Sequence, residues 1–272
     1  MTTDNTPRGY VPRSYNLSDD RLDQMKKPAF PRAATYDPDW VLDNEMGPNV
    51  LWLTEWAMGD FPLKPGMRVL DLGCGKALSS IFLAKEYDVT VWAADLWIPA
   101  TDNWRRIEAA GFADRIFPIH AEAHDLPFAD DYFDAIVSFD AYHYFGTDDL
   151  YLGYISRFLK PGGWMCAVLP TLSRDLPDGP PATLKPYWDW QFGCFHSIDW
   201  WRQHWQKSGL VSVERAEGLP DGWELWAEWC EICAEVGAGL GGMEASKEAE
   251  MLRLDGGETF GFGRIVASKP GG

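Results

Sequence analysis

The chain has 272 residues and carries 41 acidic against 24 basic side chains, which gives a formal net charge of -17 at pH 7. This length suits one large domain or one domain with a lid. Hydrophobic residues make up 46% of the chain, enough to build a core, which excludes disorder over most of the length. The acidic balance argues against nucleic acid as a partner, because binding to phosphate backbones needs clustered Lys and Arg.

The sequence predicts neither a membrane span nor a secretory signal. Its apolar runs are all much shorter than the roughly 18 residues that a spanning helix needs. The first ten residues, MTTDNTPRGY, lack the basic and apolar regions of an ordinary signal. The five cysteines are an odd number and are scattered, which argues against a disulfide framework. We therefore expect a cytoplasmic protein; nothing in the sequence indicates an oligomeric state.

The first 44 residues differ in character from the rest. Residues 1–44 are rich in Pro, Arg, Asp and Tyr and lack sustained periodicity, which predicts an N-terminal arm or lid. Residues 45–272 form the predicted main domain. From Met67 onward, short apolar runs alternate with longer amphipathic ones, as in repeated βαβ units. Seven strands are predicted, at 67–72, 89–94, 115–120, 133–139, 164–169, 210–216 and 260–268.

Helices are predicted between the strands, at 77–87, 100–110, 148–159 and 198–208. Thr101, Thr147 and Ser197 are the predicted N-caps of the last three, and Gly111 and Gly209 follow two of the helix ends. Strands that alternate with crossover helices imply an α/β fold with a mostly parallel sheet covered on both faces.

The stretch between the fifth strand and the helix at 198–208 is too long for a simple connection. Residues 170–196 are Pro-rich and are predicted to form a lid insertion. Within it, residues 187–192 read YWDWQF, four aromatic residues around one carboxylate. Such a cluster can hold an ammonium group through cation–π contacts, or it can anchor a closing lid by its apolar area.

The first strand runs into a glycine turn, Asp71-Leu72-Gly73-Cys74-Gly75, and a helix follows. Glycines let the backbone turn tightly and let a ligand approach the N-terminus of the helix. A dinucleotide-binding fingerprint would need a third glycine at position 78, where the chain has Leu78. Asp71 would repel a pyrophosphate and is better suited to an ammonium group.

The second strand ends in an acid. Asp95 lies twenty residues after Gly75 and is followed by Leu96 and Trp97. An acid at this position can accept both ribose hydroxyls, and the apolar residues beyond it can cover an adenine face. The ligand so described has adenine, ribose and a cationic amino-acid tail but no phosphate, which fits S-adenosylmethionine.

Four segments, in order and at the right spacing, resemble class I S-adenosylmethionine-dependent methyltransferases. VLDLGCGKALSS (69–80) resembles their first motif, and AADLW (93–97) their acidic loop. AEAHDLPFADDYFDAIVSF (121–139) is similar to their DAxxLPFxDxxFD segment, and LKPGG (159–163) to their turn into strand five. The chain is most similar to the small-molecule members, of the quinone-biosynthesis and cyclopropane-fatty-acid-synthase-like type. The resemblance implies a Rossmann-like fold, S-adenosylmethionine as cofactor and a small-molecule acceptor.

The resemblance also implies a set of cofactor-binding residues. Asp71, Gly73 and Gly75 would surround the methionine end, with Cys74 between the two glycines, and Asp95 would bind the ribose. The remaining implied contacts are Leu96 or Trp97 against adenine, Glu122 and Ala123 at the adenine edge, and Phe139 and Asp140 beside the methionine part. The chain departs from the family at Glu122, where the usual residue is Asp.

The predicted catalytic residues follow the fourth strand. By the resemblance, His143 lies where many relatives place a histidine that faces the substrate, and histidine suits proton removal near neutral pH. Tyr142 is predicted to orient His143 or to line the pocket, as is Tyr144. The alternative is that this segment packs against the following helix and that His143 bonds a backbone carbonyl.

The C-terminal part carries most of the negative charge. Residues 217–258 hold 11 acidic and 2 basic residues. Glu224, Glu228, Glu231 and Glu235 form one stripe on a predicted helix, which we interpret as solvated, whereas the tryptophans at 223, 226 and 229 are predicted to be core. Cys230 and Cys233 form a CxxC without a second pair or a nearby His pair, so no metal site is expected.

Two alternatives remain open at this point. A nicotinamide-dinucleotide oxidoreductase shares the strand–turn–helix arrangement, but Leu78 and the LPF and LKPGG segments favour the methyltransferase. A non-catalytic S-adenosylmethionine-binding protein would carry the same ligand motifs, which are clearer than the catalytic ones.

Overall fold

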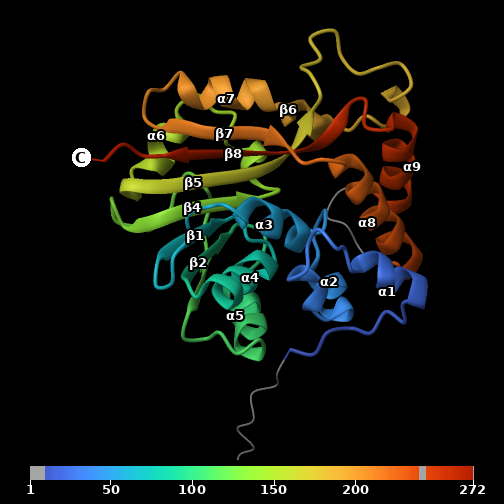
Figure 1. Cartoon of the computed structure of the whole chain (residues 1–272), viewed down its shortest axis with the longest axis horizontal. Coiled ribbons are helices and arrows are strands. Elements are labelled where there is room, and N and C mark those ends of the chain that lie inside the picture. Colours follow the sequence, from blue (N-terminus) through green and yellow to red (C-terminus); the bar gives the residue numbers. More distant parts are fainter. Residues whose placement is uncertain (1–9, 239–242, 272) are drawn as a thin grey trace, which may run out of the picture.

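One mixed sheet crosses the molecule, with helices on both of its faces (Figure 1). The computed structural model describes residues 10–238 and 243–271. The strands are β1 (Arg68–Leu72), β2 (Thr90–Asp95), β3 (Ile116–His120), β4 (Phe133–Phe139), β5 (Leu159–Leu172), β6 (His196–Ser197), β7 (Ser212–Gly218) and β8 (Phe260–Ser268). Their order is β3-β2-β1-β4-β5-β8-β7, and β8 is antiparallel to both neighbours. Each of the seven predicted strands overlaps a strand of the observed sheet, and the mostly parallel arrangement is confirmed. The sheet of the described residues has eight strands rather than seven, because the two-residue β6, which pairs with the end of β5, was not predicted.

Alternate side chains of the central strands lie in two separate hydrophobic cores, one on each face of the sheet. Val69 and Val137 lie in the core under α3, α4 and α5, whereas Leu70 and Ile136 lie in the core under α6 and α7. Successive side chains of a strand point to opposite faces, so strands covered on both faces are apolar throughout. The helices are α1 (Asp19–Met25), α2 (Pro38–Asn44), α3 (Val50–Met58), α4 (Leu78–Tyr87), α5 (Ala100–Ala109), α6 (Tyr151–Ser156), α7 (Ile198–Gln206), α8 (Gly222–Val236) and α9 (Ala245–Asp255).

Of the three predicted N-caps, only Ser197 is confirmed, since its hydroxyl accepts a hydrogen bond from the Trp200 amide. Thr101 lies inside α5, which begins after Pro99 without a side-chain cap. Thr147 precedes α6 by several residues, and α6 is shorter than the predicted helix at 148–159. The helix ends before residue 159 because β5 already begins at Leu159, which pairs with Phe133 of β4.

Three segments far apart in the sequence gather beyond the carboxyl ends of the parallel strands, and we call their described residues the cap: residues 10–49, residues 173–195, and residues 219–238 with 243–259 (Figure 1, right side). The indole Nε1 of Trp229 in α8 donates a hydrogen bond to the carbonyl of Gly47 at 2.8 Å. Trp188 of the second segment stacks on Phe260 at 5.8 Å. The third segment lies between the antiparallel strands β7 and β8; its helix α8 was predicted from the glutamate stripe, whereas α9 was not.

The acidic stripe of α8 is not simply solvated, which corrects the prediction. Glu228 pairs with Lys27, Glu235 with Arg21 at 2.7 Å, and Glu231 with Arg253 of α9 at 2.7 Å. Exposed ion pairs of this kind contribute little stability each, so the buried Trp226 and Trp229 carry most of the contact. Burial of these two tryptophans was predicted from the helical pattern and is confirmed; Trp223 is only half-buried.

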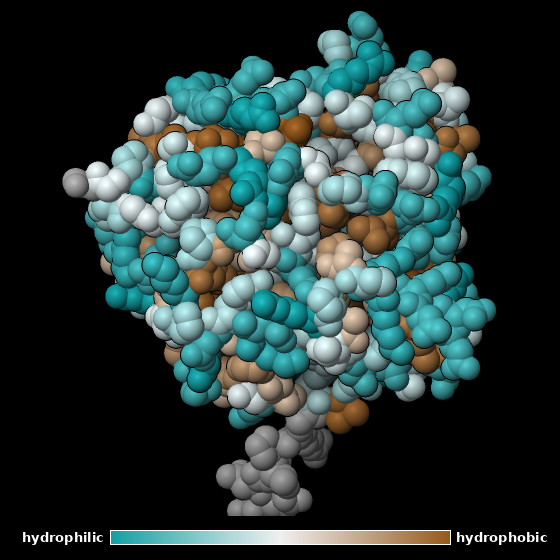
Figure 2. Space-filling view, viewed as in Figure 1, coloured by the Kyte–Doolittle hydropathy of each residue, from teal (hydrophilic) through white to brown (hydrophobic). Residues whose placement is uncertain are grey.

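The face shown in Figure 2 is mainly hydrophilic, with hydrophobic residues visible in small separate areas. Within the two described ranges, we find no helix that is both long and apolar enough to span a bilayer.

Candidate functional site

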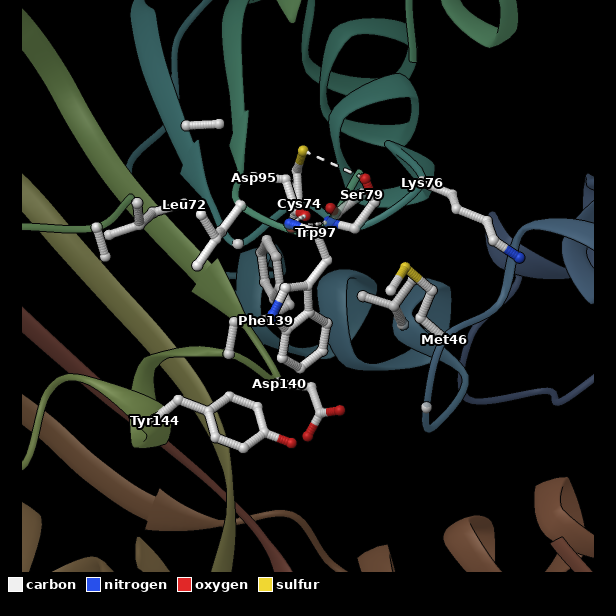
Figure 3. Close-up of a pocket in the computed structure, with 18 of the residues that line it drawn as sticks. Met46, Leu72, Cys74, Lys76, Ser79, Asp95, Trp97, Phe139, Asp140 and Tyr144 are labelled. Atoms are coloured by element: carbon white, nitrogen blue, oxygen red, sulfur yellow. Dashed lines mark hydrogen bonds between the residues drawn. The ribbon is translucent and has the colours of Figure 1, made fainter. Parts of the chain in front are cut away.

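A cavity of about 180 Å³ opens at the carboxyl ends of β1, β2 and β4. Its wall combines the glycine turn after β1, the end of β2, residues 121–123, the segment after β4, and residues 44–50 of the cap (Figure 3). In a doubly wound sheet a crevice forms where the chain leaves adjacent strands toward opposite sides, here between β1 and β4. The topology therefore places this cavity where such folds bind ligands.

The two glycines of the turn are required by both conformation and space. Gly73 has a φ of +74° and Gly75 a φ of +52°. A Cβ on Gly73 would lie 2.3 Å from the Cβ of Ala141, and one on Gly75 would lie 2.9 Å from the Sδ of Met46. The absence of side chains lets the turn fit between the segment after β4 and the cap, with its backbone in the cavity wall.

Asp95 joins the turn to the end of β2. Its carboxylate accepts hydrogen bonds from the amides of Gly75 at 2.8 Å, Trp97 at 2.8 Å and Ile98 at 2.9 Å. The side chain is 8% exposed, and it lines the cavity. A carboxylate offers about four acceptor positions, so these three bonds leave capacity for a ligand hydroxyl.

Asp71 lies behind the turn rather than in the cavity wall. It is fully buried, and its Oδ2 accepts hydrogen bonds from the hydroxyls of Ser79 and Ser80, each at 2.6 Å. Burial raises the pKa of Asp71 to about 6, against the lowering effect of the two serines. Its Oδ1 has no partner among the described residues. Asp71 thus holds the first turn of α4, and its contact with a cofactor stays a prediction.

The structure gathers the other predicted cofactor residues around one space. Those that line the cavity are Gly73, Cys74, Gly75, Asp95, Leu96, Trp97, Glu122, Ala123, Phe139 and Asp140. Glu122 turns its carboxylate to His124, with its Oε2 accepting from the His124 amide and its Oε1 beside the ring Nδ1. The bond to the His124 side chain lowers the pKa of Glu122. Its contact with adenine stays a prediction.

Part of the wall was not found from the sequence. Met46, Gly47 and Lys76 line the cavity, although residues 44–50 belong to no recognised motif. The Nζ of Lys76 donates to the carbonyls of Asp43 at 3.0 Å and Glu45 at 3.2 Å, which ties the glycine turn to the cap. The only available signal was the position of Lys76, directly after the glycine turn.

The predicted catalytic pair lies outside the cavity wall. His143 is 1% exposed and packs against the rings of Tyr144 and Phe195, with centroids 4.1 and 5.3 Å away. Burial lowers the pKa of His143 to about 3, so its imidazole is neutral at physiological pH. Tyr142 packs against Trp201 and Trp205 of α7, and burial raises its pKa. Catalysis by either residue stays a prediction.

Asp140 is a carboxylate of the cavity wall that could pair with a ligand. It follows β4 in a left-handed conformation with a φ of +56°, is half-buried, and lines the cavity. Within the described residues its carboxylate has neither a hydrogen-bond donor nor a cation as partner, and its Oδ2 would lie 2.7 Å from a Cβ on Gly47. Burial raises the pKa of Asp140 well above its ordinary value, and repulsion from Glu248 adds to this. A cation placed beside it would reverse that shift.

Two aromatic rings stand next to this carboxylate. Trp97 and Tyr144 are in contact, with ring centroids 5.8 Å apart. Figure 3 shows the indole of Trp97 and the ring of Tyr144 close to the Asp140 side chain in this view. An acid with aromatic neighbours was predicted for this protein, but at a different place.

Of the two alternatives for residues 187–192, apolar anchoring is observed for Trp188 and Phe192, which pack against Phe260 at 5.8 and 5.4 Å. Trp190 is 84% exposed. The Asp189 carboxylate accepts from the amide of Gln191 at 2.9 Å and starts a short 3-10 turn. Binding of an ammonium group by this cluster stays a prediction.

The two cysteines of α8 are free and fully buried, and burial raises the pKa of both thiols. In residues 10–238 and 243–271, no group of three or more His, Cys, Asp and Glu side chains is arranged to hold a metal ion.

The doubly wound sheet, the glycine turn after β1 and the acid at the end of β2 define the class: a Rossmann-like protein with a nucleoside-binding crevice.

Comparison with known proteins narrows this class. Residues 69–163 match the methyltransferase domain family. The chain is 31% identical over 112 residues to the methyltransferase GfsG of Streptomyces halstedii, covering 41% of this chain and 40% of that protein. It is 31% identical over 128 residues to the fatty-acid O-methyltransferase of Mycolicibacterium smegmatis, covering 44% and 46%. The chain thus spans less than half the length of these two relatives.

A solved structure supports the fold over a longer stretch. The phosphoethanolamine N-methyltransferase 2 of Haemonchus contortus, in complex with S-adenosyl-L-methionine, superposes with a TM-score of 0.68 at 18% identity. The superposition covers 97% of this chain and 61% of that one. Residues 69–163 thus match the methyltransferase domain family, and the superposition supports the fold.

Proposed function

We propose that this protein transfers a methyl group from S-adenosylmethionine to a small-molecule acceptor. The observation that carries the proposal is the joint position of the glycine turn and Asp95 in one cavity wall, without the third glycine of a dinucleotide site. One relative named above is a fatty-acid O-methyltransferase and the solved structure is a phosphoethanolamine N-methyltransferase, which supports a small-molecule acceptor.

The residues present fit this cofactor. Asp95 would accept a ribose hydroxyl at its remaining acceptor position, and Leu96 with Ala123 would contact the adenine. The orphaned Oδ1 of Asp71, behind the turn, leaves one buried acceptor for an ammonium group. When bound, the cofactor supplies a methyl carbon on a positively charged sulfur. The protein then has to hold the accepting atom in line with that carbon and exclude water, which can contribute much of the rate.

We propose further that the accepting atom is the nitrogen of an amine. Asp140 supports this, since its carboxylate is half-buried, faces the cavity and lacks a partner in the described part of the chain. An ammonium group would pair with it. The nitrogen must lose a proton before it can attack, and the carboxylate of Asp140, which the ammonium group keeps ionised, is placed to take that proton. The nitrogen lone pair then forms the bond to carbon, the carbon–sulfur bond breaks, and the positive charge passes to the nitrogen.

We assign positioning, rather than proton transfer, to His143 and Tyr142, because their rings fill the interior behind Tyr144. The competing hypothesis, His143 as general base, predicts that His143→Ala lowers turnover by roughly 10²- to 10⁴-fold with cofactor affinity unchanged. Positioning predicts that cofactor affinity and turnover fall together. A pH–rate profile separates the two, since only loss of a general base removes a titration from it.

The two surrounding segments complete the proposal. We propose that residues 1–44, of which 10–44 lie within the described residues, and residues 170–196 close over the bound substrates in the cytoplasm. Residues 10–44 contribute α1 and α2 to the cap and Asn44 to the cavity wall. The bounds of these two segments, 1–44 and 170–196, are taken from the sequence-based prediction.

Calorimetry tests the assignment. S-adenosylmethionine and S-adenosylhomocysteine should bind, whereas NAD and NADP should not. Preference for NADH would overturn the assignment in favour of an oxidoreductase. Binding of S-adenosylmethionine without turnover on amine, hydroxyl, thiol and carbon acceptors would identify a non-catalytic binding protein instead.

A further inference from the structure

A second cavity, of about 240 Å³, lies on the other side of Tyr144. Tyr144 lines both this cavity and the cofactor cavity, so its side chain forms a shared wall. The phenol is 47% exposed, and its hydroxyl lies 3.5 Å from the Oε1 of Gln191 in the second cap segment. The remaining lining residues are Thr147, from the segment after β4, and Trp190, Gln191, Gly193, Cys194 and His196, from the second cap segment and its C-terminal flank.

The chemistry of this second cavity is aromatic and uncharged. Trp190 presents 84% of its surface to solvent, a costly arrangement for a large apolar side chain that no partner covers in the described chain. His196 stacks on Trp200 with centroids 3.8 Å apart and an interplanar angle of 10°. Burial lowers the pKa of His196, so it is neutral at physiological pH. No Lys, Arg, Asp or Glu among the described residues lines this space.

On the other side of Tyr144, the cofactor cavity presents Asp140, a carboxylate without a cation as described above. Glu248 of α9 is a second acid near this region, since it adds to the raised pKa of Asp140. Burial raises the pKa of Tyr144, and the carboxylates of Asp140 and Glu248 raise it further. A cationic group therefore gains electrostatic energy at Asp140, whereas a carboxylate or phosphate is repelled. The cofactor cavity thus favours a cationic group at Asp140, whereas the adjoining second cavity favours an uncharged group.

We propose that the second cavity binds the uncharged aromatic or apolar tail of an amine acceptor, whose nitrogen lies at Asp140, with Tyr144 between the two. This inference rests on the proposed function and adds the shape of the acceptor: a flat or apolar group joined to an amine, without an anionic substituent. Trp190 and Tyr144 are then the residues that determine specificity for the tail.

Three probes with the same phenyl tail test the charge requirement. Phenethylamine, 2-phenylethanol and 3-phenylpropionate are titrated by calorimetry into the full chain saturated with S-adenosylhomocysteine. We expect phenethylamine to bind at least about tenfold more tightly than the other two, because only it can pair with Asp140. Asp140→Asn should remove this preference. Asparagine tolerates the left-handed backbone at this position, so the variant should fold.

A second pair of variants tests the tail site. Trp190→Ala should weaken phenethylamine binding by about threefold to tenfold and leave ethylamine, which has no tail, unaffected. Leu150→Ala is the matched control, because Leu150 is a large apolar residue that is 80% exposed and lines neither cavity. It should leave both affinities unchanged.

The outcomes separate this inference from the proposed function. Failure of S-adenosylhomocysteine to bind would overturn the proposed function and this inference with it. If that ligand binds but the three probes bind equally, or not at all, this inference is overturned together with the assignment of an amine nitrogen, whereas methyl transfer to a small molecule is not. The tail site is likewise overturned if Trp190→Ala behaves like Leu150→Ala. Binding of phenethylamine that depends on both Asp140 and Trp190 would support it.

Discussion

The two halves of the site are built in different ways. Most of the cofactor half comes from one continuous unit, β1, the glycine turn, α4 and β2, which Asp95 closes by accepting from the amide of Gly75, and residues 121–123 add to its wall. The acceptor half draws on the cap, on the segment after β4 and on residues 190–196. The first half is specified mainly by local backbone requirements, and the second by which distant segments meet. Variants in the first half should therefore change cofactor affinity, and exchange of an exposed residue of the second half, such as Trp190, should leave it nearly unchanged.

The largest effect is expected at the turn. Gly73→Ala should abolish measurable cofactor binding and lower the free energy of unfolding by more than about 2 kcal/mol, because it adds a clash to the strain of a positive φ. The matched control is Gly66→Ala, since Gly66 has a φ of +79° but open space around its Cβ position. It should cost only about 1–2 kcal/mol and leave cofactor affinity intact. Equal behaviour of the two variants in calorimetry and denaturation would contradict the steric argument.

Asp95 gives the next largest effect. Asp95→Ala should weaken S-adenosylhomocysteine binding by about 1.5–3 kcal/mol, because charge-assisted hydrogen bonds to the ribose are lost. Asp88 lies just before the opposite end of β2 and pairs with Arg115 on the surface, so Asp88→Ala should leave binding unaffected. Calorimetry measures both. Retention of full affinity in Asp95→Ala would mean that the acid serves only to hold the turn.

Glu45, in the cap, should affect stability and its pH dependence. The side chain is buried, its Oε2 has no partner in the described chain, and burial raises its pKa to about 8. In the unfolded chain Glu45 has its lower, ordinary pKa, so it loses its proton at a lower pH than in the folded chain. The stability that protonated Glu45 contributes is complete below the ordinary pKa and is lost as pH rises through about 8. Glu45→Gln stays neutral and should be more stable than the parent at pH 9 by about 1–3 kcal/mol.

Urea denaturation at pH 5.5 and pH 9 checks this, and both values avoid the isoelectric region near 4.6. The advantage of Glu45→Gln should shrink at the lower pH, where the parent is protonated. A variant that is less stable than the parent at pH 9 would show that the ionised carboxylate is compensated. Cofactor affinity should be the same in both proteins.

The smallest effects are expected from contacts that join α8 to the first cap segment. Trp229→Phe keeps apolar bulk but loses the bond to the Gly47 carbonyl, and should cost about 0.5–1.5 kcal/mol of stability. Lys27→Met breaks the partly exposed pair with Glu228 and should cost only about 0.2–1 kcal/mol. If Lys27→Met proved the more damaging in thermal unfolding, ion pairing rather than burial would hold the cap.

The sequence predicted the strands and the cofactor wall because each signal there is local. Strands covered on both faces are continuous apolar runs, a positive φ calls for glycine, and the acids that follow strand ends all lie at one edge of a parallel sheet. Asp95 was predicted from its place at the end of a strand and Ala123 from the family resemblance, and both line the cavity although they come from different βα units. Asp71 lies behind the turn, where its Oδ2 accepts hydrogen bonds from Ser79 and Ser80.

On the acceptor side, only the tertiary structure determined which side chains face the cavity and which are buried. Whether His143 or Tyr144 faces the cavity depends on a short 3-10 turn after β4, which is fixed by packing of Tyr142 against α7. Whether Trp188 or Trp190 is buried depends on Phe260, more than 60 residues further along the chain. Periodicity records which side chains are apolar within one element. It does not record which distant element covers them, since that choice is set by the summed burial of the whole chain.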